Sequence, residues 1–242
     1  MNRILFERDE IKDGVATFGG VRAEHVMRVL HGEVGQMLKT GEVDGKIGMG
    51  EIVECSPARV KVRCDHVEES PRPWIDLILA PPRPRVMKRL LPQLASLGVG
   101  RIFLVGAKKV EKDFWGAMLL KPENYRPLLV DGLMQAGTSI LPTLETRRNF
   151  RKFVCDELDA LWPESKRIVA HPYGSADNRT IRQSNNQTIL LAVGPEGGWT
   201  DGEVALLEEH GFSRYSLGSR ILRTDTATIA LLAQLMKEFG QC

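Results

Sequence analysis

Residues 190–198 have the sequence Leu190-Leu191-Ala192-Val193-Gly194-Pro195-Glu196-Gly197-Gly198, an apolar run followed directly by a turn rich in glycine. The run is typical of a buried strand. In the turn, Gly194 and the Gly197-Gly198 pair allow positive φ and leave the backbone uncovered, and Pro195 makes the turn rigid. Backbone groups can therefore contact a ligand there, although an ordinary turn between a strand and a helix has the same composition.

A helix over residues 203–210 is expected directly after this turn. Thr200 or Asp201 can accept hydrogen bonds from the first N–H groups of the helix, and Gly211 can end it. The turn would then be held between two rigid elements, a strand and a helix.

A second constrained stretch, residues 217–227, lies between a short expected strand and a strongly apolar helix expected over residues 226–239. Within this stretch, Arg220 and Arg223 flank two apolar residues. Two arginines in such a place need anionic partners.

The composition indicates a folded protein of ordinary size and leaves its partner open. The chain has 242 residues, 43% of them apolar, which is enough for a substantial core. A net charge of +2 neither requires nor excludes a nucleic-acid partner. Acidic residues outnumber basic ones before residue 70, so the basic character belongs to the rest of the chain.

The cysteine spacing and the N-terminal sequence indicate a reduced protein of the cytoplasm. Cys55, Cys64, Cys155 and Cys242 form no C-x-x-C pair, and the five histidines add no ligand pattern, so no metal site is expected. The sequence shows neither the apolar core of a signal peptide nor a run of transmembrane length. We therefore expect a soluble, cytoplasmic protein without a membrane partner.

Two unequal domains are predicted, residues 1–70 and 71–242, with the boundary in a charged stretch that contains proline. In the first domain, short β-type pieces separated by glycines favour a small β-barrel with one helical piece. The β-type pieces are residues 36–40, 46–54 and 58–64, and the helical piece is residues 22–30.

The second domain alternates apolar strands with helices, which is typical of an open α/β layer around a parallel sheet. The expected strands are residues 75–80, 101–106, 167–171 and 188–193, and the expected helices between them are residues 85–97, 123–136 and 151–161.

Together, the turn at residues 194–198 and the stretch at residues 217–227 resemble, in order and spacing, the RsmE-type methyltransferases of the SPOUT (α/β-knot) superfamily. That family uses S-adenosylmethionine to methylate ring nitrogen 3 of a uridine in small-subunit (16S) ribosomal RNA. The resemblance implies a SPOUT trefoil-knot α/β domain with a mainly parallel sheet, preceded by a small PUA-like β-barrel domain that is associated with RNA. It also implies a homodimer.

The resemblance further implies where S-adenosylmethionine is held. Leucine and isoleucine side chains can form an apolar slot for adenine, and backbone groups beside glycine can pair with its edges. His171 follows an earlier strand, and backbone groups could equally satisfy its ring. The expected cofactor-binding residues are His171, Gly194, Pro195, Glu196, Gly197, Gly198, Leu217, Gly218, Ile221, Leu222 and Thr226.

Methylation of a uracil nitrogen leaves negative charge on the flanking oxygens, so a cation should face the base. Arg223 is the expected catalytic residue for this role, and Arg220 is expected to bind a phosphate of the RNA or a neighbouring loop. Glu196 is a second catalytic candidate, as a base or as a counter-charge to the sulfonium, but a loop carboxylate can also cap a helix.

Further RNA contacts are expected in both domains. His25 and Arg28 resemble the family's His-x-x-Arg-Val-Leu signature, although they could equally form the polar face of an amphipathic helix. Ala107-Lys108-Lys109 replaces a Ser-Glu-Arg element of the family, and Lys108 and Lys109 can bind phosphate as flexible point charges.

The chain departs from the family elsewhere too, in residues 92–96 and in residues 134–138, which keep only Gln135 of a Glu-Gln-x-x-Arg element. Two alternatives therefore stay open: a non-catalytic RNA-binding factor with a degenerate methyltransferase domain, and a SPOUT methyltransferase that acts on a different RNA nucleotide. A small-molecule enzyme on a Rossmann-like sheet is a third, but no G-x-G-x-x-G opens a helix after a strand.

Overall fold

The computed structural model describes residues 2–56, 58–173 and 188–238, and the chain divides into two compact units. The first comprises Met1–Arg72 and Leu129–Leu141, and the second comprises Pro73–Leu128 and Pro142–Cys242. The sequence predicted one boundary near residue 71 and did not anticipate that a later segment returns to the first unit. Two residues named in the sequence analysis, position 239 of the last expected helix and the cysteine at position 242, lie outside the described residues.

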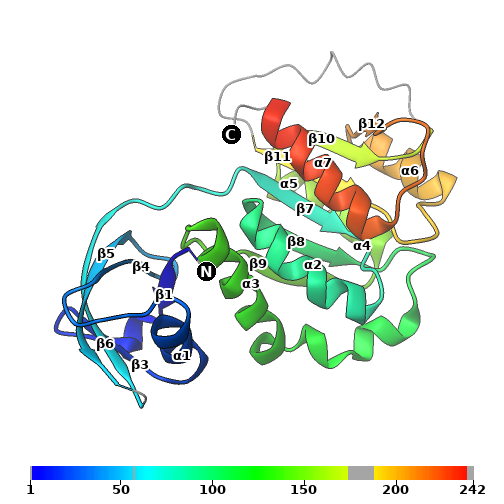
Figure 1. Cartoon of the computed structure of the whole chain (residues 1–242). Coiled ribbons are helices and arrows are strands. Elements are labelled where there is room, and N and C mark those ends of the chain that lie inside the picture. Colours follow the sequence, from blue (N-terminus) through cyan, green and yellow to red (C-terminus); the bar gives the residue numbers. More distant parts are fainter. Residues whose placement is uncertain (1, 57, 174–187, 239–242) are drawn as a thin grey trace. The chain divides into compact units, whose positions relative to one another are not determined.

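The first unit is built on a curled six-stranded sheet whose apolar face packs against helix α1 (Gly20–Arg28) (Figure 1). Ala23 and Val26 of the helix lie in one buried cluster with Phe6 and Ile52 of the strands. Neighbouring strands are antiparallel except β1 and β4. In sheet order the strands are β1 (Ile4–Phe6), β4 (Met37–Glu42), β5 (Ile47–Cys55), β6 (Val60–Glu68), β3 (Val15–Phe18) and β2 (Ile11–Lys12), and a short 3-10 helix, η1 (Arg8–Glu10), precedes β2.

Segment Leu129–Leu141 belongs to the first unit because hydrogen bonds join it there. The carbonyl of Met134 accepts from the amides of Asn2 and Arg3, both at 3.0 Å. The guanidinium of Arg3 also donates from Nε to the carbonyl of Gly137 at 2.9 Å. Residues 134–138, which replace a family element, therefore serve as a structural junction within this unit.

The second unit contains a six-stranded sheet in which all neighbouring strands are parallel. This confirms the predicted α/β layer, and β7, β8, β10 and β11 correspond to the four predicted strands. In sheet order the strands are β12 (Ser213–Tyr215), β10 (Lys166–Ala170), β11 (Ile189–Val193), β7 (Ile75–Leu79), β8 (Val99–Val105) and β9 (Thr143–Arg147).

Helices cover both faces of this sheet (Figure 1). On one face, α2 and α7 lie side by side and contact β8 and β11 respectively, whereas α4 contacts α5 and α6 on the other face. The helices are α2 (Pro84–Ser96), α3 (Pro122–Ala136), α4 (Phe150–Asp156), α5 (Leu158–Leu161), α6 (Asp201–Glu209) and α7 (Thr224–Glu238), with short 3-10 helices η2 (Lys112–Gly116) and η3 (Met118–Leu120) after β8.

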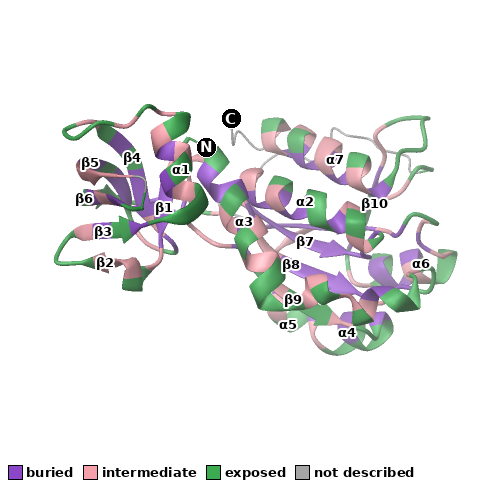
Figure 2. Ribbon diagram, turned by 60° about the horizontal axis from the view of Figure 1, so that its bottom comes forward, coloured by how far each residue is buried: buried purple, intermediate pink, exposed green. Residues whose placement is uncertain are grey.

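The central strands β7 and β11 are buried at every position because helices cover both of their faces (Figure 2). This explains why their sequences are nearly continuous apolar runs without the alternation of a half-exposed strand. Alternate side chains point to opposite faces. On one face, Ile78, Phe103 and Leu190 pack with Phe153 of α4 and Leu207 of α6.

Several strands escaped prediction for local reasons. β9 is largely polar, and it lies at one end of the sheet order. β1, β2 and β3 are too short to show an alternating pattern.

Asp76 is a buried charged residue of β7, and hydrogen bonds satisfy it. Its carboxylate accepts from the backbone N–H of Arg101 at 2.9 Å, from Nε of the Arg101 side chain at 2.8 Å and from the indole of Trp162 at 2.7 Å. The Arg101 guanidinium also lies over the Trp162 ring, 4.5 Å from its centroid. One carboxylate thus ties β7 and β8 to the residue that follows α5.

We expect Asp76→Ala to lower the free energy of unfolding by about 3–5 kcal/mol, because the charge of Arg101 and the N–H of Trp162 lose their buried acceptor. Glu208→Ala is the matched control, since the ion pair between Glu208 and Arg214 is exposed and its loss should barely change stability. Urea denaturation of the two variants measures the difference. Equal losses in both would show that the Asp76 cluster adds nothing beyond a surface ion pair.

Candidate functional site

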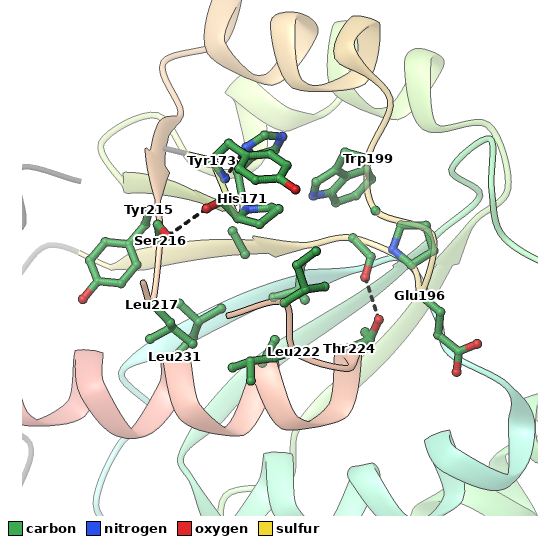
Figure 3. A pocket seen from close by; sticks show the side chains of 18 of the residues that line it. His171, Tyr173, Glu196, Trp199, Tyr215, Ser216, Leu217, Leu222, Thr224 and Leu231 are labelled. Atoms are coloured by element: carbon green, nitrogen blue, oxygen red, sulfur yellow. Dashed lines mark hydrogen bonds between the residues drawn. The ribbon is translucent and has the colours of Figure 1, made fainter. Parts of the chain in front are cut away.

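A pocket of about 410 Å³ opens beyond the carboxyl ends of β10 and β11 (Figure 3). Ligands usually bind at this edge of an open parallel sheet. The pocket brings together the end of β10, the turn after β11, the segment between β12 and α7, and the first turns of α7. All predicted cofactor-binding residues except Thr226 line it.

The three glycines of the turn after β11 differ in their backbone conformation and in the space around them. Among Gly194, Gly197 and Gly198, only Gly198 has positive φ, 71°. The other two are needed for space: a Cβ at Gly194 would lie 3.1 Å from the backbone nitrogen and the indole of Trp199, and one at Gly197 would lie 3.0 Å from Cδ of Lys109. Of the three glycines, Gly198 thus uses the positive φ that glycine allows, whereas at Gly194 and Gly197 a Cβ would come close to a neighbouring residue.

The predicted cap of the following helix is confirmed. Thr200 Oγ1 accepts from the amide of Glu203 at 3.3 Å, and the Thr200 amide donates to the Glu203 carboxylate at 2.8 Å, so the two form a capping box. The other carboxylate oxygen of Glu203 accepts from the backbone N–H of Lys108 at 2.7 Å. Gly211 has φ of 81° just after the helix, as a terminating glycine should. The turn is thus anchored to α6 and to the loop after β8.

Ser216 joins the second stretch to the end of β10. Its hydroxyl lies 3.2 Å from the carbonyls of Pro172 and Gly218 and accepts from the amide of Gly218 at 3.1 Å (Figure 3). Gly218 has φ of 114°, a conformation that favours glycine. These contacts hold residues 216–218 against the residues that follow β10.

Thr224, not Thr226, contributes to the pocket. The Thr224 side chain is buried, and its hydroxyl donates to the carbonyl of Gly194 at 3.2 Å (Figure 3). Thr226 is exposed and lies outside the pocket lining. Two residues along a helix turn a side chain by about 200°, so Thr226 faces another direction than Thr224. The cofactor contact of Thr226 stays a prediction.

Apolar side chains form the wall of the pocket on the α7 side. Leu217, Leu222 and Leu231 point toward its interior in Figure 3. Ile221 lies at the rim with 75% of its surface exposed. This arrangement offers an apolar slot for a flat ring.

Trp199 is a pocket residue that the sequence analysis did not single out. It is 6% exposed, and its indole Nε1 is buried without a hydrogen-bond partner among the described residues. An unpaired buried donor beside a pocket is costly unless a ligand accepts from it. The signal available in sequence was its place directly after the glycine pair.

Two further polar groups border the pocket. His171 lines the pocket, and its Nδ1 accepts a hydrogen bond from the amide of Tyr173 at 3.2 Å. A backbone group therefore satisfies one nitrogen of the ring. Tyr215 donates its hydroxyl to Glu238 at 3.0 Å, and burial, together with that carboxylate, raises the pKa of the Tyr215 phenol. The phenol therefore stays neutral.

The charged candidates lie at the rim or outside it. Glu196 and Arg220 are exposed residues of the lining, and Figure 3 shows the Glu196 side chain directed away from the interior. Arg223 is exposed and does not line the pocket. The catalytic roles of Glu196 and Arg223 and the RNA contact of Arg220 stay predictions.

The two lysines after β8 differ in position. Lys109 lines the pocket, and its ammonium donates to the carbonyl of Gly197 at 2.7 Å. Lys108 is exposed, and its backbone N–H is the group held by Glu203. Lys109 therefore supports the turn, whereas Lys108 has its side chain at the surface.

His25 and Arg28 lie on α1 of the first unit. Arg28 is exposed and pairs with Glu24 one turn earlier, at 2.7 Å. The ring of His25 is partly buried, and its Nε2 has no hydrogen-bond partner among the described residues. Their roles in RNA binding stay predictions.

Residues 2–56, 58–173 and 188–238 contain neither a cluster of metal-ligating side chains nor a helix suited to span a membrane. Within these ranges, His, Cys, Asp and Glu side chains do not gather in groups of three or more that could hold a metal ion. Within the same ranges, none of the helices combines the length and the apolar character that crossing a membrane requires.

We expect Thr224→Val to lower the free energy of unfolding by about 1–2 kcal/mol, because it keeps the shape of the side chain but leaves the Gly194 carbonyl without its donor. Amide hydrogen exchange at residues 194–198 should also become faster. Thr226→Val is the matched control on the exposed side of the same helix and should change neither quantity. A similar response to both substitutions would mean that the Thr224 hydroxyl does not hold the turn.

Relatives of known name match the chain over nearly its whole length. Ribosomal RNA small subunit methyltransferase E of Treponema pallidum is 28% identical over 98% of this chain and 91% of its own length. Ribosomal RNA small subunit methyltransferase E 1 of Borreliella burgdorferi is 29% identical over 95% of each chain.

Solved structures have the same fold. A methyltransferase from Legionella pneumophila, in complex with its bound cofactor SAM, matches with a TM-score of 0.77 and 26% identity over 98% of this chain and 97% of that chain. Ribosomal RNA small subunit methyltransferase E of Neisseria gonorrhoeae, bound to S-adenosyl methionine, matches in fold with a TM-score of 0.76 and 22% identity over 99% and 98% of the two chains. Residues 68–236, which are more than half of the chain and include every residue of the pocket, match the RNA methyltransferase domain family. The chain therefore belongs to the RNA methyltransferase domain family.

Proposed function

We propose that this protein transfers a methyl group from S-adenosylmethionine to ring nitrogen 3 of a uridine in 16S ribosomal RNA. Its membership of the RNA methyltransferase family and the names of its relatives support an RNA substrate. A ribosomal RNA substrate would place the protein in the cytoplasm of a bacterium.

The observation that carries this proposal is the pocket formed by the turn after β11 and residues 216–224. Its features fit S-adenosylmethionine. Leu217 and Leu222 offer an apolar slot for adenine, and Trp199 Nε1 is a buried donor in need of an acceptor. Gly194 and Gly197 carry no side chain, so their backbone groups stay uncovered for a ligand.

S-adenosylmethionine supplies a methyl group on a positively charged sulfur. The N3–H proton of the base passes to water, the N3 electron pair forms the new bond to carbon, and the pair of the broken S–CH₃ bond stays on sulfur. The protein must hold the two reactants in contact and stabilise the negative charge that develops on the uracil oxygens. A role of Glu196 as counter-charge to the sulfonium would need its side chain to turn toward the larger pocket, because Figure 3 shows it directed away from the interior.

We further infer that the second unit is a SPOUT trefoil knot and that the first is a PUA-like barrel that contacts RNA. The hydrogen bond from Thr224 to Gly194 supports the former, because it ties the segment before α7 to the turn after β11. The curled sheet around α1, which carries His25 and Arg28, supports the latter.

A non-catalytic RNA-binding factor would lack activity despite the fold, and a methyltransferase of another specificity would modify a different nucleotide. Mass spectrometry of 16S ribosomal RNA from cells lacking the gene separates all three outcomes. We expect one uridine to lose its N3-methyl group and to regain it when the purified protein and S-adenosylmethionine are added.

Cofactor binding is tested by calorimetry with S-adenosylmethionine. We expect the parent protein to bind and Gly194→Val to abolish binding, because the added side chain would collide with Trp199 and displace the turn. Gly202→Ala is the matched control: Gly202 lies in α6 with open space around the position of its Cβ, so affinity should stay the same. Unchanged affinity in a folded Gly194→Val protein would remove the turn from the cofactor site.

We also propose a homodimer, supported by the apolar residues Ile221 and Leu222, which are 75% and 37% exposed at the pocket rim. Light scattering at micromolar concentration should show a dimer. Ile221→Glu should shift it toward the monomer, because an unpaired charge is costly to bury. Met118→Glu is the control, because Met118 is an exposed apolar residue outside the pocket, and this variant should remain a dimer. A fully active monomeric parent protein would contradict the dimer.

A further inference from the structure

A second pocket, of about 160 Å³, borders the same turn. Pro195, Glu196, Gly197 and Lys109 line both pockets, so the two pockets adjoin at these residues. The Glu196 side chain, which points away from the interior of the larger pocket in Figure 3, belongs to the lining of the smaller one.

The smaller pocket lies at the same edge of the sheet. Pro81, Pro82 and Arg83 follow β7, whereas Val110 and Glu111 follow β8. Both strands end at the edge where β11 enters the shared turn, and β7 lies between β11 and β8 in the sheet. The two pockets are therefore neighbours by topology, at the edge where parallel sheets usually bind ligands.

We propose that this second pocket receives the acceptor base of the RNA and that Arg83 donates hydrogen bonds to a uracil carbonyl oxygen during methyl transfer. The proposal rests on the function proposed above. Bond formation requires the acceptor nitrogen to lie about 3–3.5 Å from the methyl carbon. The acceptor site must therefore adjoin the cofactor pocket, and this pocket meets it at the residues that line both.

The size and the walls of the pocket suit a single flat ring. Its volume equals that of roughly five water molecules, which is room for one pyrimidine but not for a stretch of RNA. Pro81 and Pro82 are buried and rigid, Phe114 is 2% exposed, and Val110 is partly buried. Apolar walls of this kind can hold the faces of a base, and the specificity must then come from polar groups at the rim.

The charge at the rim matches the charge that the reaction creates. Arg83 Nε lies 2.9 Å from Glu111 Oε1, and this hydrogen bond, with the charges of Glu111 and Glu196, holds the pKa of the Arg83 guanidinium above its ordinary value. Its other N–H groups can face a carbonyl oxygen. Lys109, the other cation of the lining, already donates to the Gly197 carbonyl. Arg83 is therefore the cation placed to stabilise a uracil that has lost its N3 proton.

The experiment compares Arg83→Gln with Arg85→Gln, using small ribosomal subunits from cells lacking the gene and labelled S-adenosylmethionine. Arg85 is exposed, lies two residues further along the chain and is not part of the pocket, so both variants lose one charge from the same surface. We expect Arg83→Gln to lower kcat about 100-fold, as loss of an oxyanion donor does, and Arg85→Gln to leave it within a few-fold. Calorimetry should give unchanged S-adenosylmethionine affinity in both.

A pH profile separates catalysis from a structural role. The defect of Arg83→Gln should shrink as pH rises, because the base then loses its N3 proton without help from the guanidinium. A kcat within a few-fold of the parent, or a defect that does not change with pH, would overturn the role of Arg83. If the parent protein binds the cofactor but does not methylate 16S ribosomal RNA, both the proposed function and this inference are overturned. If the parent is active and the Arg83→Gln variant is unimpaired, only the inference is overturned.

Discussion

The candidate site depends on the hydrogen bond from the Thr224 hydroxyl to the carbonyl of Gly194, which joins two segments distant in sequence. Thr224 begins α7, and the buried residues Leu231 and Leu232 hold that helix against the sheet. Gly194 ends the buried run of β11, and its missing Cβ lets Trp199 pack beside it. The turn therefore gains its position from the packed core of the sheet, and a ligand meets backbone groups that are already in place.

The turn serves two pockets because its two sides have different neighbours. Toward α7 it faces apolar side chains, and toward the loops after β7 and β8 it faces both apolar walls and the charged residues Arg83 and Glu111. Lys109 holds the Gly197 carbonyl, and the Lys108 amide is held by Glu203. In sequence, these lysines replace a Ser-Glu-Arg element and could bind phosphate, whereas in the structure the Lys109 side chain and the Lys108 backbone amide each make a hydrogen bond that supports the turn or its neighbouring helix.

Much of the second unit could be predicted because its physical causes are local. Strands covered on both faces give continuous apolar runs, and the capping residue Thr200 and the terminating residue Gly211 mark the two ends of the helix after the turn. Where a residue's role depends on which way it faces, prediction was weaker. Thr226 was chosen where Thr224 forms the contact, because the choice depends on where α7 begins and hence on which of its sides meets the sheet.

By itself, the sequence determined the α/β class of the second unit, the turn after β11 and the segment before α7 as the two halves of one site, and the likeness to RNA methyltransferases. Only the tertiary structure decided that Leu129–Leu141 returns to the first unit, that the buried indole N–H of Trp199 has no partner among the described residues, and that Arg83 borders a second pocket. The physical reason is that apolar periodicity and helix capping depend on residues close together in the sequence. The three features that only the structure decided depend on contacts between residues far apart in the chain.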